Sequence, residues 1–206
     1  PLRRQRQMCI RDSVNGKVYY GAWSDVKSIK TANNDITKAS VSGISTKAFT
    51  GKNITQSITV KYNGKTLKNG TDYTVSYSSN KNIGTATVKI AGKCSYTGTI
   101  TKTFKINPAK QEIQKLTAKS KAFFVDWAQK GSATGYEIEY SSNADFKDST
   151  VKKLTANKPD TLTISGLTAG NKYYVRVRSY TNVGEKVYYG AWSDSKNITT
   201  AKYDIT

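Results

Sequence analysis

The chain has 206 residues, a formal net charge of +19 and no histidine. The absence of histidine removes the commonest general base, proton shuttle and metal ligand, which weakens the case for catalysis. No stretch of about 18 consecutive apolar residues is present, so the sequence predicts no transmembrane helix.

The N-terminal segment is unusually rich in arginine. Residues 3–13 read RRQRQMCIRDS, which resembles one translated reading frame of a widely used transposase sequencing adapter. We therefore expect residues 1–13 to be an artefact of an assembled environmental read, which carries no information about the fold. The alternative is a basic arm that binds nucleic acid or membrane. Without residues 1–13 the net charge falls to +16, and one cysteine, Cys94, remains.

Residues 14–37 and 183–206 are two copies of one segment, 169 positions apart, with 17 identities in 24 positions. A period of this length is typical of two small domains per repeat. We interpret residues 14–36 as the remnant of a preceding domain and residues 202–206 as the start of the linker to the next repeat. A lone strand arm cannot bury its apolar face, so we expect disorder or docking on a sheet edge.

From residue 14 onward the sequence predicts an all-β fold of two consecutive β-sandwiches, after an N-terminal remnant strand. The first domain is expected over residues 37–107. Alternation places Tyr73, Val75 and Tyr77 on one face of a strand, and Asn63-Gly64 predicts a tight hairpin. The expected strands are 58–62, 73–78, 85–91 and 99–106.

The string LKNGTDYTVSYSSNKNIGTATVKIAGKCSYTGTITKTFKI, residues 67–106, resembles an immunoglobulin-like repeat of Gram-positive bacterial surface proteins. The resemblance implies a sandwich without catalytic residues. Cys94 stands where the family often has glycine, so a slightly altered turn is expected there. With no histidine to act as its base, Cys94 is interpreted as a buried or half-buried small residue.

The second domain is expected over residues 108–201, after the short connector Asn107-Pro108-Ala109. Trp127 shares a strand with Phe124 or Val125, and TLTISGLTAGNKYYVRVRSY and GAWSD follow. These strings resemble the fibronectin type III pattern, which implies that Leu167 and either Tyr173 or Tyr174 anchor the core. Residues 14–36 are then the remnant of another such domain. The expected strands are 113–118, 122–128, 135–141, 151–154, 161–164, 172–181 and 191–199.

An aromatic cluster is the candidate ligand contact. Tyr188, Tyr189 and Trp192, with Lys186 nearby, lie close to the last turn of the second domain, and such a cluster can hold a sugar ring or a peptide. In the alternative interpretation Trp192 plugs the end of the sandwich and one tyrosine covers it. Glu137 and Glu139 share one strand face, and we expect them to be solvated charges. The sequence predicts no catalytic pair, no cofactor and no metal site.

Charge is unevenly divided between the two domains. Residues 37–107 carry +10 with a single acid, Asp72, whereas residues 108–201 carry +5. The cations are nearly all lysine, which argues against sequence-specific nucleic-acid recognition. We expect a monomeric, non-catalytic spacer or stalk repeat of a large extracellular bacterial protein, surface-attached or secreted. The alternatives are an adhesin module that binds cell-wall glycans, host glycans, mucin or host proteins such as immunoglobulin, and the accessory region of a secreted polysaccharide hydrolase or peptidase.

Overall fold

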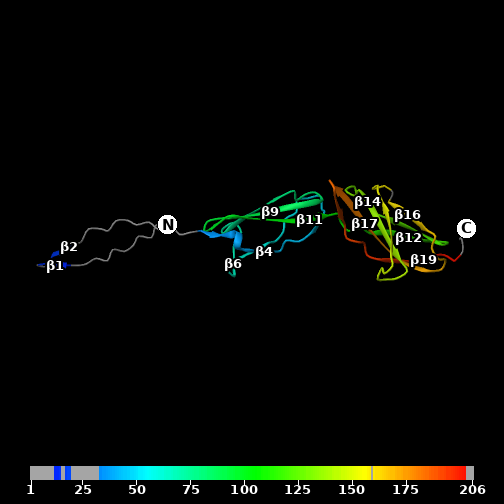
Figure 1. The fold of residues 1–206 in the computed structure, drawn as a ribbon, viewed down its shortest axis with the longest axis horizontal. Coiled ribbons are helices and arrows are strands. Elements are labelled where there is room, and N and C mark those ends of the chain that lie inside the picture. The colour runs from blue at the N-terminus through cyan, green and yellow to red at the C-terminus, as the bar shows by residue number, and fades with distance from the viewer. Residues whose placement is uncertain (1–11, 15–16, 20–32, 159, 203–206) are drawn as a thin grey trace. The chain divides into compact units, whose positions relative to one another are not determined.

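The computed structural model describes residues 12–14, 17–19, 33–158 and 160–202, which are drawn in colour in Figure 1. Within these residues the regular structure is β-strand and one short 3-10 turn, η1 (Ile36–Lys38), so the all-β expectation is confirmed. The chain divides into two units, Pro1–Asn34 and Asp35–Thr206, and each is described by itself.

Among the described residues of the first unit, β1 (Asp12–Val14) and β2 (Lys17–Tyr19) form a hairpin. The Val14–Lys17 pair has the same register as the Val183–Lys186 pair in the second copy of the repeat. We expected disorder or edge docking here, and instead β2 pairs with a strand that includes Asp12 and Ser13 of the adapter-like string. The rest of that string and residues 20–32 lie outside the described residues.

The first sandwich extends from β3 to β11. A four-stranded sheet has the order β5-β11-β9-β8, a three-stranded sheet has the order β4-β6-β7, and β3 pairs with β10. The bounds are β3 (Asn34–Asp35), β4 (Ser40–Ser42), β5 (Lys47–Ala48), β6 (Thr59–Tyr62), β7 (Lys65–Thr66), β8 (Tyr73–Ser78), β9 (Gly84–Gly92), β10 (Tyr96–Thr97) and β11 (Thr99–Asn107). The four expected strands are confirmed to within one residue at each end, while the two- and three-residue strands had not been predicted.

Period-two alternation builds the core of this sandwich. On β8, Tyr73 is buried and Val75 and Tyr77 are half-buried, while Thr74, Ser76 and Ser78 are exposed. The Asn63-Gly64 turn has φ values of 47° and 79°, as the tight hairpin requires. Ile36 is fully buried in this core, and the Asp35 carboxylate accepts a 3.0 Å hydrogen bond from the Thr37 amide. Asp35 and Ile36 therefore contribute to this sandwich, directly before the expected start of the domain at residue 37.

Cys94 is exposed, so the expectation that it is buried or half-buried is wrong. It lies in the turn between β9 and β10 with a φ of 56°, in the left-handed region that favours glycine. The Tyr96 amide closes this turn on the Lys93 carbonyl at 3.1 Å. The backbone geometry thus agrees with the glycine that the resemblance places here, and it directs the thiol into solvent.

The second sandwich packs two sheets. One has the order β12-β13-β16, and in the other β17 pairs with β14, β18 and β19, while β15 pairs with β14. The bounds are β12 (Ile113–Lys119), β13 (Ala122–Trp127), β14 (Gly135–Ser141), β15 (Thr150–Leu154), β16 (Thr161–Ser165), β17 (Lys172–Val183), β18 (Lys186–Tyr189) and β19 (Lys196–Thr199). Six of the seven expected strands are confirmed to within two residues.

The seventh expected strand, 191–199, is wrong in its first half. β18 ends at Tyr189 and β19 begins at Lys196. Between them the chain touches β17 at Ser193, whose amide donates to the Val177 carbonyl at 2.8 Å and whose Oγ accepts from the Val177 amide at 3.0 Å. A side-chain oxygen replaces a backbone carbonyl in the ladder, which breaks the strand into two.

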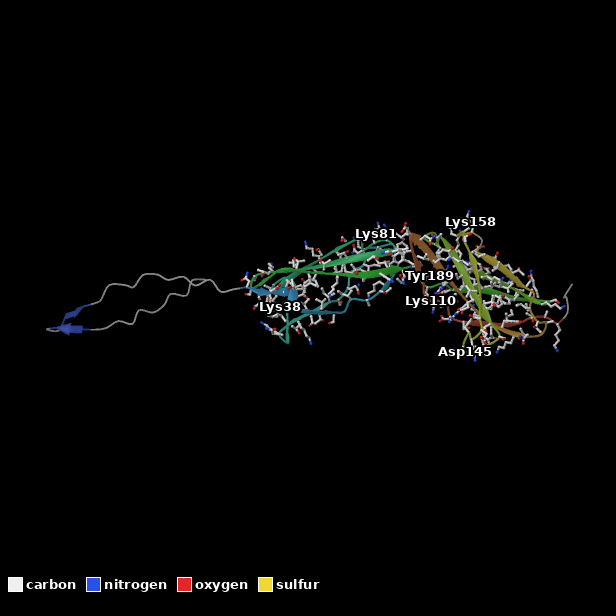
Figure 2. The ribbon with its side chains drawn as sticks, viewed as in Figure 1. Lys38, Lys81, Lys110, Asp145, Lys158 and Tyr189 are labelled. Atoms are coloured by element: carbon white, nitrogen blue, oxygen red, sulfur yellow. The ribbon has the colours of Figure 1, made fainter. Side chains whose placement is uncertain are left out.

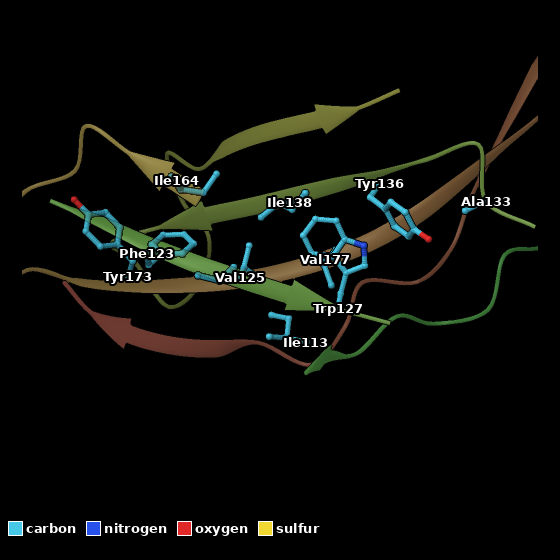
Figure 3. Close-up of a cluster of buried hydrophobic side chains, with 11 residues drawn as sticks. Ile113, Phe123, Val125, Trp127, Ala133, Tyr136, Ile138, Ile164, Tyr173 and Val177 are labelled. Atoms are coloured by element: carbon cyan, nitrogen blue, oxygen red, sulfur yellow. The ribbon is translucent and has the colours of Figure 1, made fainter. Parts of the chain in front are cut away.

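The core of the second sandwich surrounds Trp127. Figure 3 shows Val125 and Trp127 of β13 close to Ile138 and Tyr136 of the facing strand β14, and the Trp127 and Tyr136 ring centroids are 5.3 Å apart. Val125, rather than Phe124, is the partner that shares the buried face with Trp127. Of the two tyrosine candidates, Tyr173 belongs to the core.

Replacing Ile36 with alanine tests where the first sandwich begins. Because Ile36 is fully buried, I36A should lower the free energy of unfolding of this sandwich by about 2–5 kcal/mol. Urea unfolding of the full chain, followed by amide NMR signals of each sandwich, measures the effect. Signals from β12 to β19 are the internal control and should keep their midpoint. A loss below about 1 kcal/mol would place Ile36 outside the core.

Candidate functional site

The hairpin of β17 and β18 positions Lys186, Tyr188 and Tyr189, and the fourth candidate ligand contact, Trp192, follows β18. The hairpin turn contains Gly184 at a φ of 58°, and the strands pair from Val183–Lys186 back to Tyr180–Tyr189. Because neighbouring residues of a strand point to opposite faces, the hairpin sends Tyr188 and Tyr189 in different directions. Lys186 is exposed close to the turn. The four residues that lie together in the sequence therefore do not form one cluster.

Tyr188 belongs to the junction between the two sandwiches. Only 6% of it is exposed, and its hydroxyl is hydrogen-bonded to Thr85 Oγ1 of β9 at 2.9 Å. A methyl group added at Gly190 would lie 3.1 Å from the carbonyl oxygens of Pro108 and Ala109, so the chain after β18 packs directly on the connector. Pro108 itself is buried. The Lys110 ammonium also lies 2.6 Å from the Asp194 carboxylate.

Tyr189 and Trp192 lie on the outer face of the sheet, where they stack on two arginines. The Arg178 guanidinium is 4.2 Å from the Trp192 ring centroid and 4.3 Å from that of Tyr189, which is labelled in Figure 2. Arg176 lies 4.9 Å from Trp192 and 4.0 Å from Phe146. We call these five side chains the outer stack. Trp192 is not part of the core, so the alternative in which it plugs the sandwich end is wrong.

Two carboxylates fix the arginines of the outer stack. Glu137 pairs with Arg178 in the strand register, and Arg178 Nη2 donates to Glu137 Oε2 at 2.7 Å. Glu139 lies opposite Arg176, whose Nε donates to Glu139 Oε2 at 2.5 Å. The two glutamates are 6% and 7% exposed, so the expectation of solvated charges is wrong. They do lie on the face opposite the core, but the outer stack covers that face.

The surroundings of Glu139 lower the pKa of its carboxyl group. Burial would raise the pKa of this carboxyl, but hydrogen bonds from Arg176 and from Ser149 Oγ, together with the charges of Arg176 and Arg178, hold its pKa below the ordinary value. Ser149 Oγ donates to Glu139 Oε1 at 2.6 Å. Glu139 therefore stays ionised and cannot serve as a proton donor near neutral pH.

Sequence reasoning missed the role of Arg176 and Arg178, although the pattern carried a signal. They are the arginines that remain once residues 1–13 are left out, and their spacing of two matches that of Glu137 and Glu139 on another predicted strand. Matched i, i+2 charges of opposite sign are typical of facing positions on neighbouring strands. What the pattern could not give was the pairing of those two strands.

The described residues offer little chemistry beyond stacking and ion pairing. They contain no group of three or more His, Cys, Asp or Glu side chains placed to hold a metal ion. None of them belongs to a helix long and apolar enough to cross a membrane. Tyr20 and Trp23, from the first copy of the aromatic motif, lie outside the described residues.

A glutamine at position 139 tests the buried ion pair. E139Q should lower the free energy of unfolding at pH 7 by about 1–3 kcal/mol, because it removes charge-assisted hydrogen bonds. The folded-state pKa of Glu139 lies below its unfolded value, so its contribution is present above about pH 4.3 and is lost as the pH falls through the folded pKa. The gap in the free energy of unfolding between wild type and E139Q should therefore shrink as the pH falls.

Urea unfolding from about pH 7 down to about pH 2.5 measures this gap. The exposed Glu112 supplies the control, since E112Q should stay within about 0.5 kcal/mol of wild type throughout. A gap for E139Q that keeps the same size across the whole range would contradict the lowered pKa.

Comparisons with known proteins bear on the family of the second sandwich. Residues 108–196 match the family model for the fibronectin type III domain. No curated protein matches the sequence. Among solved structures, an fn3 domain of human contactin 1 is 16% identical, with a TM-score of 0.40 over 48% of this chain and 84% of that chain. The chicken CNTN1 FN1-FN3 domains are also 16% identical, with a TM-score of 0.40 over 83% of this chain and 68% of that chain. A computer-redesigned β-sandwich protein is 22% identical, with a TM-score of 0.37 over 46% and 97% of the two chains. The family match shows that residues 108–196 form a fibronectin type III domain.

Proposed function

We propose that this chain is a non-catalytic spacer segment of a large extracellular bacterial protein, either attached to the cell surface or secreted. In this proposal residues 37–107 belong to a bacterial immunoglobulin-like domain, which precedes the fibronectin type III domain in each repeat. The observation that carries the proposal is the packed junction between the two sandwiches. A spacer has to hold its ends apart, and that requires junctions that resist bending.

Relative motion is the default expectation for two domains joined by a short connector. Here three features oppose it. Pro108 restricts the connector, the Tyr188 hydroxyl is bonded to Thr85, and Gly190 lies against the carbonyls of the connector. β18 also lies against β11 of the first sandwich. Tyr188 of the second sandwich is thus buried in part by its contact with the first sandwich.

The environment of Glu137 and Glu139, the candidates for acid–base catalysis, supports the proposal that the chain is non-catalytic. Glu137 and Glu139 are each held by an arginine, and both lie under the outer stack. A glycosidase needs two carboxyls that face each other across an open site, one of them with a raised pKa. The pKa of Glu139 is shifted in the opposite direction.

The proposal also includes ligand binding by the aromatic residues, as a secondary function. Tyr189, Trp192 and Lys186 remain candidate contacts for a sugar or a peptide, whereas Tyr188 is engaged in the junction. Because two guanidinium groups already lie over the Trp192 ring, a ligand at this position would contact the edge of the outer stack. Binding there is compatible with spacing, since the junction lies on a different side of the hairpin.

Tyr188 and Tyr189 offer a matched pair for testing the junction. Y188F removes the hydroxyl that meets Thr85, which should weaken the junction by about 1 kcal/mol and make its open form about fivefold more populated. Y189F removes a neighbouring hydroxyl of the outer stack and should leave the junction unchanged. 15N relaxation and residual dipolar couplings of the full chain report whether the two sandwiches tumble together.

In the wild type the two sandwiches should share one alignment tensor and one correlation time. Y188F should increase the difference between the two correlation times, and Y189F should not. Independent tumbling of the wild-type sandwiches would overturn the spacer proposal.

A further inference from the structure

The outer face of the sheet β5-β11-β9-β8 is lined almost entirely by hydroxyl groups. Strand register sets its rows: Ser76 and Thr101 flank Lys89, Ser78 and Thr103 flank Thr87, and Lys105 lies opposite Thr85. We call this surface the Thr/Lys face. Its members are Thr74, Ser76, Ser78, Thr85, Thr87, Lys89, Ala91, Thr99, Thr101, Thr103 and Lys105.

Nearly all of these side chains are accessible to a ligand. Thr87 and Ala91 are half-buried and the others are exposed, although Thr85 is already bonded to Tyr188 at the junction. The face carries no carboxylate, no arginine and no aromatic ring. Rows on such a sheet repeat about every 7 Å along a strand and about 4.8 Å across strands. The result is a regular grid of hydrogen-bonding groups with two lysine charges, Lys89 and Lys105.

The two sandwiches differ in their ion pairs and in their content of acidic residues, and the second serves as an internal comparison for the first. The four ion pairs among the described residues all lie between residues 110 and 194. In residues 35–107, all of which are described, no lysine pairs with a carboxylate, and the Asp72 carboxylate accepts from the Lys68 backbone amide at 2.8 Å. A lysine-rich genome or a need for solubility would act on both domains. Acid depletion confined to one domain is the charge pattern expected of a surface that meets a negatively charged partner.

We propose that the Thr/Lys face binds a linear polysaccharide that carries sulfate or phosphate esters. Lys89 and Lys105 supply charge-assisted hydrogen bonds to the ester groups, and the surrounding hydroxyls bond to the sugar hydroxyls. Nucleic acid fits the face less well, because there is no aromatic side chain for base stacking and no arginine fork. The proposal goes beyond spacing and does not depend on a rigid junction.

Paired lysine substitutions of equal charge test the proposal in the full chain. K89S/K105S removes both charges from the Thr/Lys face while adding hydroxyls. K61S/K65S removes two exposed lysines from the other sheet, on β6 and β7. The arginines at positions 3, 4, 6 and 11 are present in every variant, so their attraction to a polyanion cancels in the comparison.

The probes are dextran sulfate, phosphorylated dextran, plain dextran and a single-stranded oligonucleotide of matched charge density, titrated calorimetrically at about 150 mM salt. We expect binding to at least one charged dextran, with K89S/K105S about tenfold weaker and K61S/K65S within about twofold of wild type. The stronger of the two charged dextrans identifies the ester. Amide NMR shifts of β9 and β11 should map the contact, and thermal unfolding confirms that both variants fold.

Three results would overturn the proposal. Equal losses in the two double variants would mean attraction to net charge alone. Tighter binding of the oligonucleotide than of either charged dextran would assign the face to nucleic acid. No binding of the wild type to either charged dextran at this salt concentration would leave the face without the proposed partner. None of these results bears on whether the two sandwiches tumble together.

Discussion

The strand β17 is the element on which the second sandwich depends, because β14, β18 and β19 all pair with it. Its alternation sends Val175 and Val177 into the core and Arg176 and Arg178 to the opposite face. The same twelve residues therefore carry both the apolar packing and the charged layer. Beyond the core β17 continues into the hairpin with β18, which carries Tyr188 to the junction.

The two sandwiches differ in the side chains that line the outer faces of their sheets. Each sandwich has to present a stable outer sheet face to water. The fibronectin type III domain covers its face with arginines that are paired to glutamates and stacked on aromatic rings. The first sandwich leaves short hydroxyl side chains and unpaired lysines on its face. The covered face favours stability of the domain, whereas the open face leaves hydrogen-bonding groups free for a partner.

Strand alternation made much of the fold predictable from the sequence. Because side chains of a strand alternate between faces, Tyr73, Val75 and Tyr77 could be assigned to one buried face, and Asn63-Gly64 to a hairpin. The fibronectin type III match likewise covers the residues whose strings suggested it. The division of strand 191–199 could not be predicted, since it depends on Ser193 bonding to a backbone amide of a distant strand.

The sequence by itself determined most of the longer strands, the alternation of their two faces and where one segment repeats, because these properties depend on neighbours along the chain. The tertiary structure alone decided what covers each face. Glu137 and Glu139 are buried because Arg176 and Arg178, about forty residues away, lie opposite them in the register. Tyr188 meets a threonine of another domain while Tyr189 meets an arginine of its own. Adjacent residues with identical side chains thus acquire different roles, because burial depends on contacts between segments that are distant in sequence.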